Sequence, residues 1–479
     1  MDKSEDFFTD VSELKKLESN SNLGRDVESE SEVNDRATMR YVDFRVLPIL
    51  ALTYAFSLID RVNLGSAMVA GMAGDLQMLV GNRYSIVTVV YFIPYILLQI
   101  PGNAILRAVG VRYCMTFVIV VWGAVTIGMG FTKHWEAFAV CRVLISALEA
   151  MFFPGMVFII STWYKRHEVQ KRLAAFCLTS ALIGGFSPLL AYSLSLMDGK
   201  ANVAGWAWIF IMEGIITVVL GLLCYLFVPE FPDRNRFLSK AQTAFVLKRI
   251  EDDRGDSTPD EITARKVLHH CKDWRIWMYG VMFACPNLAS YMFALFMPII
   301  LNGMNFSYEK SLLLTSPPYG FAFVSSMIIS WTSDKTRHRG GFVVLSALMT
   351  TVGCCMTAFA QGNAVRYAGT FFICAGSAGT IPAILAWSSN NVLTHSKRAV
   401  QTAVSIVGGS VGGIMASMVF RQQDSPKYIP GLWVTIGAQI ICMILAILMS
   451  VHSYRMNKKV REGTLSEPLE GRVGFLYTP

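Results

Sequence analysis

Five ionisable residues stand inside long apolar stretches of the sequence, and they are Asp60, Arg61, Arg142, Glu149 and Glu213. An ionisable side chain near the centre of a bilayer costs about 2.5–3.5 kcal/mol on insertion scales, so it usually has a function or a charged partner. The guanidinium groups of the two arginines match a carboxylate through two parallel hydrogen bonds. These residue types therefore indicate binding of a small organic anion and of a proton.

Arg61 is predicted to be the first ligand of an anionic substrate, because it stays charged at any relevant pH. Asp60 and Glu149 are predicted to couple protons, since removal of a carboxyl from water favours its neutral acid and lets it load and release a proton. Arg142 and Glu149 are seven residues apart, on one helix face and about 10 Å from each other, so both are predicted to line one cavity. The alternative is that these four charges only neutralise one another and fix the helix packing.

Other polar residues receive weaker interpretations. Glu213 is interpreted as structural, bonded to a backbone group or an interfacial cation near its helix start. Asn287 and Tyr291 lie four residues apart on one face and are predicted substrate contacts in the second half of the chain. Several aromatic side chains could stack on an aromatic acid, although packing is the expected role of most. They are Tyr91, Tyr95, Phe152, Phe153 and Tyr291.

Two basic turns are predicted to form a gate rather than a substrate site. The first holds Arg107 and Arg112, and the second holds Asp334 and Arg337. We expect pairs between helices at these turns to latch the cytosolic end of the protein.

The elements that position these residues follow from composition. The chain has 479 residues, of which 53% are hydrophobic and 16% are charged, against about 25% charged in soluble domains. This excludes a soluble enzyme and predicts an all-α membrane protein with twelve transmembrane helices in two pseudo-symmetric six-helix halves. The predicted spans are 45–67, 84–106, 112–131, 135–160, 172–196, 206–228, 275–302, 311–332, 341–360, 366–388, 399–421 and 431–453.

The chain divides into five predicted segments. They are a flexible cytosolic N-terminal tail (1–44), a first half (45–228), a cytosolic middle loop (229–274), a second half (275–453) and a cytosolic C-terminal tail (454–479). Most of the 42 Lys and Arg residues fall on the side of the termini, which the positive-inside rule assigns to the cytosol. No cleavable signal peptide is recognisable. The net charge of +8 lies in short clusters, so no nucleic-acid partner is predicted.

Motifs of other protein classes are missing from the sequence. The ten Cys form no Cys-x-x-Cys or Cys/His metal pattern. No phosphate-binding loop of an ATP-driven pump and no catalytic nucleophile arrangement is found. We therefore predict no enzyme activity, no metal and no cofactor, with the proton as coupling ion.

Several motifs resemble the anion:cation symporter family of the major facilitator superfamily, in particular its fungal allantoate, nicotinate and tartrate-type permeases. They include Asp60 to Gly65, Arg142 with Glu149 to Gly155, Trp163 to Arg172, Gly205 to Gly214, Pro317 to Tyr319, Lys397 to Ala399 and Phe420-Arg421. The resemblance implies that carboxylates couple protons and that arginines hold the anion. It also implies that Ser410, where many relatives have Asn, lies on a cavity-facing helix, and that the protein is a monomer in the plasma membrane.

The predicted function is proton-coupled uptake of a small organic anion by alternating access between the two halves. One alternative is a proton antiporter that exports a metabolite or drug. Fungal exporters usually carry a Gly-Pro pair in the fifth span, which Gly184 to Pro188 does not reproduce. The other alternative is a nutrient sensor that binds without transporting, for which both tails are short.

Overall fold

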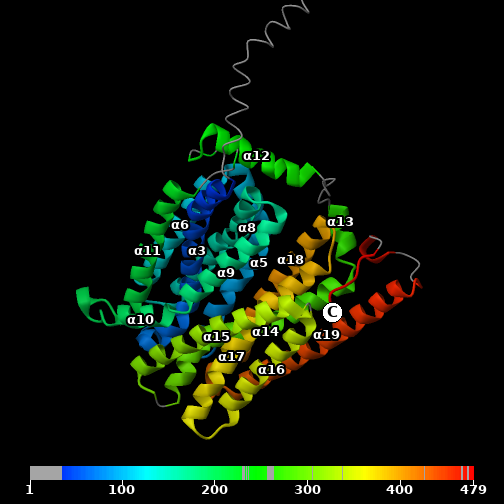
Figure 1. Cartoon of the computed structure of the whole chain (residues 1–479). Coiled ribbons are helices and arrows are strands. Elements are labelled where there is room, and N and C mark those ends of the chain that lie inside the picture. The colour runs from blue at the N-terminus through cyan, green and yellow to red at the C-terminus, as the bar shows by residue number, and fades with distance from the viewer. Residues whose placement is uncertain are drawn as a thin grey trace, which may run out of the picture.

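A computed structural model describes residues 35–228, 232, 235, 237–255, 264–304, 306–336, 338–425, 427–464, 468–471 and 474–479. Within these ranges the secondary structure is helical, with turns between the helices and no strand. The helices form two bundles that lie against each other (Figure 1). The predicted all-α fold of two six-helix halves is confirmed.

The first half contains helices α3 to α11. Their bounds are α3 Asp35–Ala67, continued by a π-helical turn Met68–Met72 and α4 Ala73–Asp75, then α5 Arg83–Val109, α6 Val111–Met129, α7 Trp135–Glu149, α8 Phe152–Trp163, α9 Arg166–Gly184, α10 Ser187–Ser195 and α11 Gly205–Phe227. Two predicted spans are broken in the structure, one between α7 and α8 and one between α9 and α10. Pro154 and Pro188 lie in the first turn after each break, where a missing amide donor costs least.

The middle segment and the second half follow. Their bounds are α12 Lys240–Gly255, α13 Ala264–His270, α14 Trp274–Asn302, α15 Tyr308–Thr336, α16 Arg339–Phe359, α17 Asn363–Asn390, α18 His395–Val419 and α19 Ile429–Arg461. Helix α12 lies across the end of the first half, near the start of α3 (Figure 1). Its Arg249 pairs with Glu168 of α9 at 2.5 Å.

Nine helices among the described residues are long and apolar enough to cross a membrane. The three other predicted spans correspond to α5 and to the broken pairs α7–α8 and α9–α10. The outer boundaries differ from the prediction at two places. Helix α3 begins at Asp35, inside the predicted flexible tail, and α19 continues to Arg461 because polar residues extend both helices beyond their apolar cores.

The two halves pack through α3 with α14, α5 with α18, and α10 with α15. Gly65 permits one close approach, because a Cβ atom there would lie 2.5 Å from the carbonyl oxygen of Leu295. Next to it, the Tyr84 hydroxyl donates to the same carbonyl at 2.9 Å. These contacts lie toward the end of the bundle opposite α12 and α13.

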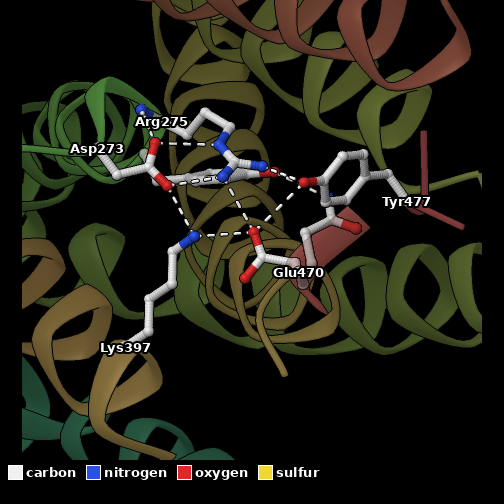
Figure 2. A network of polar contacts seen from close by, with 7 residues as sticks. Asp273, Arg275, Lys397, Glu470 and Tyr477 are labelled. Atoms are coloured by element: carbon white, nitrogen blue, oxygen red, sulfur yellow. Dashed lines mark hydrogen bonds and ion pairs between the residues drawn. The ribbon is translucent and has the colours of Figure 1, made fainter. Parts of the chain in front are cut away.

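The C-terminal residues fold back onto the second half at the end where α14 and α18 begin (Figure 2). Lys397 pairs with Asp273 at 2.7 Å and with Glu470 at 2.8 Å, and Arg275 pairs with Glu470 at 3.0 Å. Arg275 also donates to the hydroxyl of Tyr477. The segment predicted as a tail is therefore bonded to the ends of two helices.

The polar network sets the ionisation of Asp273, which lies just before α14. Burial alone raises the pKa of its carboxyl, but hydrogen bonds from Arg275 and Lys397 outweigh burial and hold the pKa well below its usual range. Further along, the Thr478 carbonyl accepts from the Trp387 indole at 2.8 Å and the Thr478 amide donates to Asn391 at 2.7 Å. These bonds extend the attachment from α14 and α18 to α17.

Candidate functional site

Four of the five charges predicted from the sequence meet in one buried cluster at the middle of the first half. Their side chains expose 4% for Asp60, 9% for Arg61, 2% for Arg142 and 1% for Glu149. Asp60 and Arg61 lie on α3, whereas Arg142 and Glu149 lie on α7. The fold therefore brings together residues that are more than eighty positions apart.

Glu149 is the acceptor at the centre of the cluster. Its Oε1 accepts from the Ser57 hydroxyl and from Nη2 of Arg61, and its Oε2 accepts from the Tyr91 hydroxyl. Three donors from α3 and α5 thus surround one carboxylate, which compensates for the water that it loses on burial. Glu149 is the last residue of α7, just before the break, so its side chain sits where two helical segments meet.

Arg61 connects the two halves. While Nη2 binds Glu149, Nη1 donates to the hydroxyl of Tyr291 on α14 at 3.1 Å. The guanidinium carbon lies 5.3 Å from the ring centre of Tyr91 and 4.9 Å from that of Tyr95, within cation–π range. Its Nε has no hydrogen-bond partner among the described residues. The guanidinium is thus held between a carboxylate of the first half and a hydroxyl of the second.

Arg142 bonds backbone oxygens of α3 and not a carboxylate. Nη1 donates to the carbonyl oxygen of Asp60 at 3.3 Å and Nη2 to that of Arg61 at 3.4 Å. Within the described residues, no carboxylate lies within ion-pair distance of Arg142 and its Nε is unpartnered. This arginine brings positive charge to the site without a direct counter-ion.

Glu213 belongs to the same region, contrary to the sequence interpretation. It is fully buried, and its Oε2 accepts from the side-chain amide of Asn63 on α3 rather than from a backbone group or an interfacial cation. Ser187 of α10 donates to Oδ1 of Asn63 at 2.5 Å. The expected partner was wrong, because the position of Glu213 early in its span does not reveal that Asn63 of α3 lies against it.

The second half contributes Tyr291 directly, and Asn287 and Ser410 nearby. Asn287 donates to the Phe283 carbonyl of its own helix at 2.8 Å, and Ser410 donates to Ile406 at 3.2 Å. Asn287 is on the α14–α18 interface, where an added Cβ on Gly409 would lie 3.4 Å from its Cγ. Tyr291 joins the charged cluster, whereas the other two make no described contact with it.

The predicted gate residues are only partly described. Arg337 and the side chain of Arg107 lie outside the described part. Arg112 donates to the Val228 carbonyl at 3.3 Å, and Asp334 pairs with Arg339 at 2.6 Å. Each of these two bonds stays within its own half.

The Thr217 hydroxyl of α11 also reaches the site, since it donates to Oδ2 of Asp60 at 3.3 Å. Sequence reasoning missed Ser57, Asn63 and Thr217 as members of the site. The signal was present in part, because Ser57, Asp60 and Arg61 follow the i, i+3, i+4 spacing of one helix face. Among the described residues, no group of three or more His, Cys, Asp or Glu side chains could hold a metal ion.

Two six-helix halves that meet at a buried, charged cluster define a membrane transport protein. A sequence profile of the Major Facilitator Superfamily matches residues 50–417. The chain belongs to the Major Facilitator Superfamily.

Individual relatives are similar over most of their length. "MFS transporter prlL" of Fungal sp. (strain NRRL 50135) is 27% identical over 440 residues, 89% of this chain and 88% of that protein. The high-affinity nicotinic acid transporter of Saccharomyces cerevisiae is 26% identical over 440 residues, 90% of this chain and 80% of that protein. A bacterial homolog to the human lysosomal transporter Spinster, in its inward-facing and unoccupied conformation, shares the fold with a TM-score of 0.67. The two proteins are 15% identical, and the match covers 85% of this chain and 95% of the bacterial chain.

Proposed function

We propose that this protein is a proton-coupled symporter of a small organic anion, in the anion:cation symporter branch of the superfamily. The observation that carries the proposal is the position of Arg61 between Glu149 and Tyr291. A guanidinium shared by a carboxylate and by the opposite half is suited to exchange one anion for another.

The coupling follows from the charges. A buried guanidinium that loses its counter-ion is destabilised by about 3–5 kcal/mol. When Glu149 binds a proton it no longer neutralises Arg61, and a substrate carboxylate can then take the position of the Glu149 carboxylate. Proton and anion thus favour each other's binding, and such coupling is reciprocal. Asp60 takes part as the second proton-coupling carboxyl, and Arg142 adds positive charge for the anion.

The rings around Arg61 favour an aromatic or heterocyclic carboxylate. Tyr91 and Tyr95 lie over the guanidinium, and Phe92 packs edge-on against Tyr291 with ring centres 5.0 Å apart. Such walls combine apolar area with one cationic anchor for a carboxylate. The name of the yeast relative, a nicotinic acid transporter, agrees with this class, so nicotinate is the probe of choice.

We place the protein in the plasma membrane with both termini in the cytosol. In that orientation the contacts of Tyr84 and Gly65 with α14 lie on the outer side. We infer that these contacts close the outer side, and that substrate is released when the halves separate on the cytosolic side.

The proposal is tested by nicotinate uptake into proteoliposomes that contain the full chain. Acid outside should raise accumulation, and the reversed gradient should lower it. Arg61→Lys keeps the charge but loses the planar fork, so uptake should fall about tenfold or more, equivalent to about 1.4 kcal/mol. Arg366→Lys, a buried arginine of α17, is the matched control and should retain uptake.

Other results would favour another function. Accumulation that rises when the inside is acid indicates proton antiport and export. Binding of nicotinate without flux indicates a sensor. Unchanged uptake in Arg61→Lys would make this arginine structural.

A further inference from the structure

Helices α3 and α11 place two carboxyl groups in one buried contact outside the Arg61–Glu149 pair. Asp60 and Asn63 are three residues apart on α3, and Glu213 and Thr217 are four apart on α11, so each pair shares a helix face. The helices run antiparallel. Thr217 faces Asp60 and Asn63 faces Glu213, so the two carboxyls lie about one helical turn apart along the axes, or about 5 Å.

Neither carboxyl has an ionic partner among the described residues. Oδ2 of Asp60 accepts from the Thr217 hydroxyl at 3.3 Å, and Oε2 of Glu213 accepts from the Asn63 amide. The second oxygen of each group, Oδ1 of Asp60 and Oε1 of Glu213, is buried without a hydrogen-bond partner. Each carboxyl therefore has one neutral donor, which is little compensation for a full charge removed from water.

The surrounding charges leave one negative charge in excess. Three carboxyls (Asp60, Glu149, Glu213) face two guanidiniums (Arg61, Arg142) from α3, α7 and α11. Arg61 is engaged by Glu149, and Arg142 bonds the backbone of Asp60, so the nearest positive charge to the pair lies on the Asp60 side. Tyr91, the other titratable group in contact, donates to Glu149. One bound proton makes the five groups neutral.

We propose that Asp60 and Glu213 form a second proton site, and that Glu213 carries its proton at neutral pH. Two carboxylates this close in a medium of low dielectric constant repel strongly, so one of them remains an acid. Glu213 is the acid because Asp60 has the guanidinium of Arg142 beside its backbone and Glu213 has only Asn63. Ser187 fixes this amide by donating to its oxygen, so its NH₂ group points to Glu213.

The site deepens the proposed symport, and it rests on that function only for its role in the transport cycle. A proton on Glu213 lies on the helix packed against the segment that carries Arg61. Release of this proton would restore the excess negative charge beside the guanidinium and weaken anion binding. The second site thus links proton release to substrate release.

The proton can be observed without any substrate. Infrared spectra of the purified full chain at neutral pH, in water and in heavy water, report buried carboxylic acids through their C=O stretching bands. Glu213→Gln should remove one such band. Glu309→Gln, which changes an exposed carboxyl of α15 outside the cluster, is the control and should leave the band unchanged.

The outcomes separate the possibilities. A band that persists in Glu213→Gln would overturn the proposal. If that band is then lost in Asp60→Asn, the proton belongs to Asp60. Loss of the wild-type band when sodium chloride replaces choline chloride would show a bound Na⁺ instead. If Glu213→Gln does not fold, Glu213→Asp keeps the acid and should shift the band. None of these readings requires nicotinate transport, so failure of the symport leaves the result interpretable.

Discussion

Arg61 in the first half donates a hydrogen bond of 3.1 Å to the hydroxyl of Tyr291 in the second half, while its other terminal nitrogen binds Glu149. One side chain therefore touches both halves of the molecule, which are the bodies that move in the alternating access proposed above. The state of Glu149 can be transmitted to the second half through this side chain, without a longer chain of contacts.

Tyr291→Phe removes the hydroxyl and keeps the ring that packs on Phe92. Because the donor is the charged guanidinium of Arg61, the hydrogen bond contributes about 1.5–3 kcal/mol, so we expect nicotinate to bind about ten- to hundredfold more weakly. Equilibrium binding to purified protein measures the change. Tyr319→Phe, on α15, is the control and should bind as wild type. Equal affinity in both variants would remove Tyr291 from the site.

Glu149→Gln imitates the protonated acid permanently. Counterflow of nicotinate should continue, because Arg61 is free for the anion, while accumulation driven by a pH gradient should be lost. Counterflow and gradient-driven accumulation are both measured in proteoliposomes. Glu136→Gln, in the first turn of the same helix, is the matched control. Accumulation that persists in Glu149→Gln would assign the coupling proton elsewhere.

Gly65→Ala should destabilise the contact between α3 and α14. Its Cβ atom would lie 2.5 Å from the Leu295 carbonyl oxygen, and such overpacking costs about 1–3 kcal/mol. A lower melting temperature in detergent is the expected result. Gly437→Ala on α19, where no atom lies within 4 Å of the added Cβ, should not lower it. Similar melting of the two variants would show that the halves are not held together at Gly65.

The attachment of the C-terminal residues should depend on pH through Asp273. Its pKa is lower in the folded protein than in the unfolded chain, so its ionic bonds stabilise the fold above the ordinary value of about 3.9 and are lost as pH falls through the lowered one. Asp273→Asn should melt below wild type at neutral pH, and the difference should narrow only below about pH 4. A difference that already narrows between pH 7 and pH 5 would contradict a lowered pKa.

Glu470→Gln should loosen the same attachment from the other side. The carboxylate loses its ion pairs with Lys397 and Arg275, so the amides of Tyr477 and Thr478 should exchange hydrogen about tenfold faster, equivalent to about 1.4 kcal/mol. Hydrogen exchange read by mass spectrometry gives the rates. Glu462→Gln, an exposed carboxyl at the end of α19, is the control. Unchanged exchange would mean that the bonds of Trp387 and Asn391 with Thr478 are sufficient to hold the C-terminal residues in place.

The sequence by itself determined the membrane class, the two-half architecture and four of the charged residues. A charge within an apolar run can be recognised without a structure, because its burial is costly. This pattern identified Asp60, Arg61, Arg142 and Glu149. Helical periodicity also assigns residues to a face, and the spacing of Asn287 and Tyr291 predicts that they share one side of α14.

Only the tertiary structure decided which partners these residues have. Periodicity gives the face of a helix and says nothing about the helix that covers it. The pairing of Arg61 with Glu149 and Tyr291, the backbone bonds of Arg142, and the burial of Glu213 against Asn63 all depend on helices distant in the chain. The attachment of the C-terminal residues to α14 and α18 was equally invisible, because Glu470 and Tyr477 carry no periodic signal and gain their partners only when the helix ends assemble.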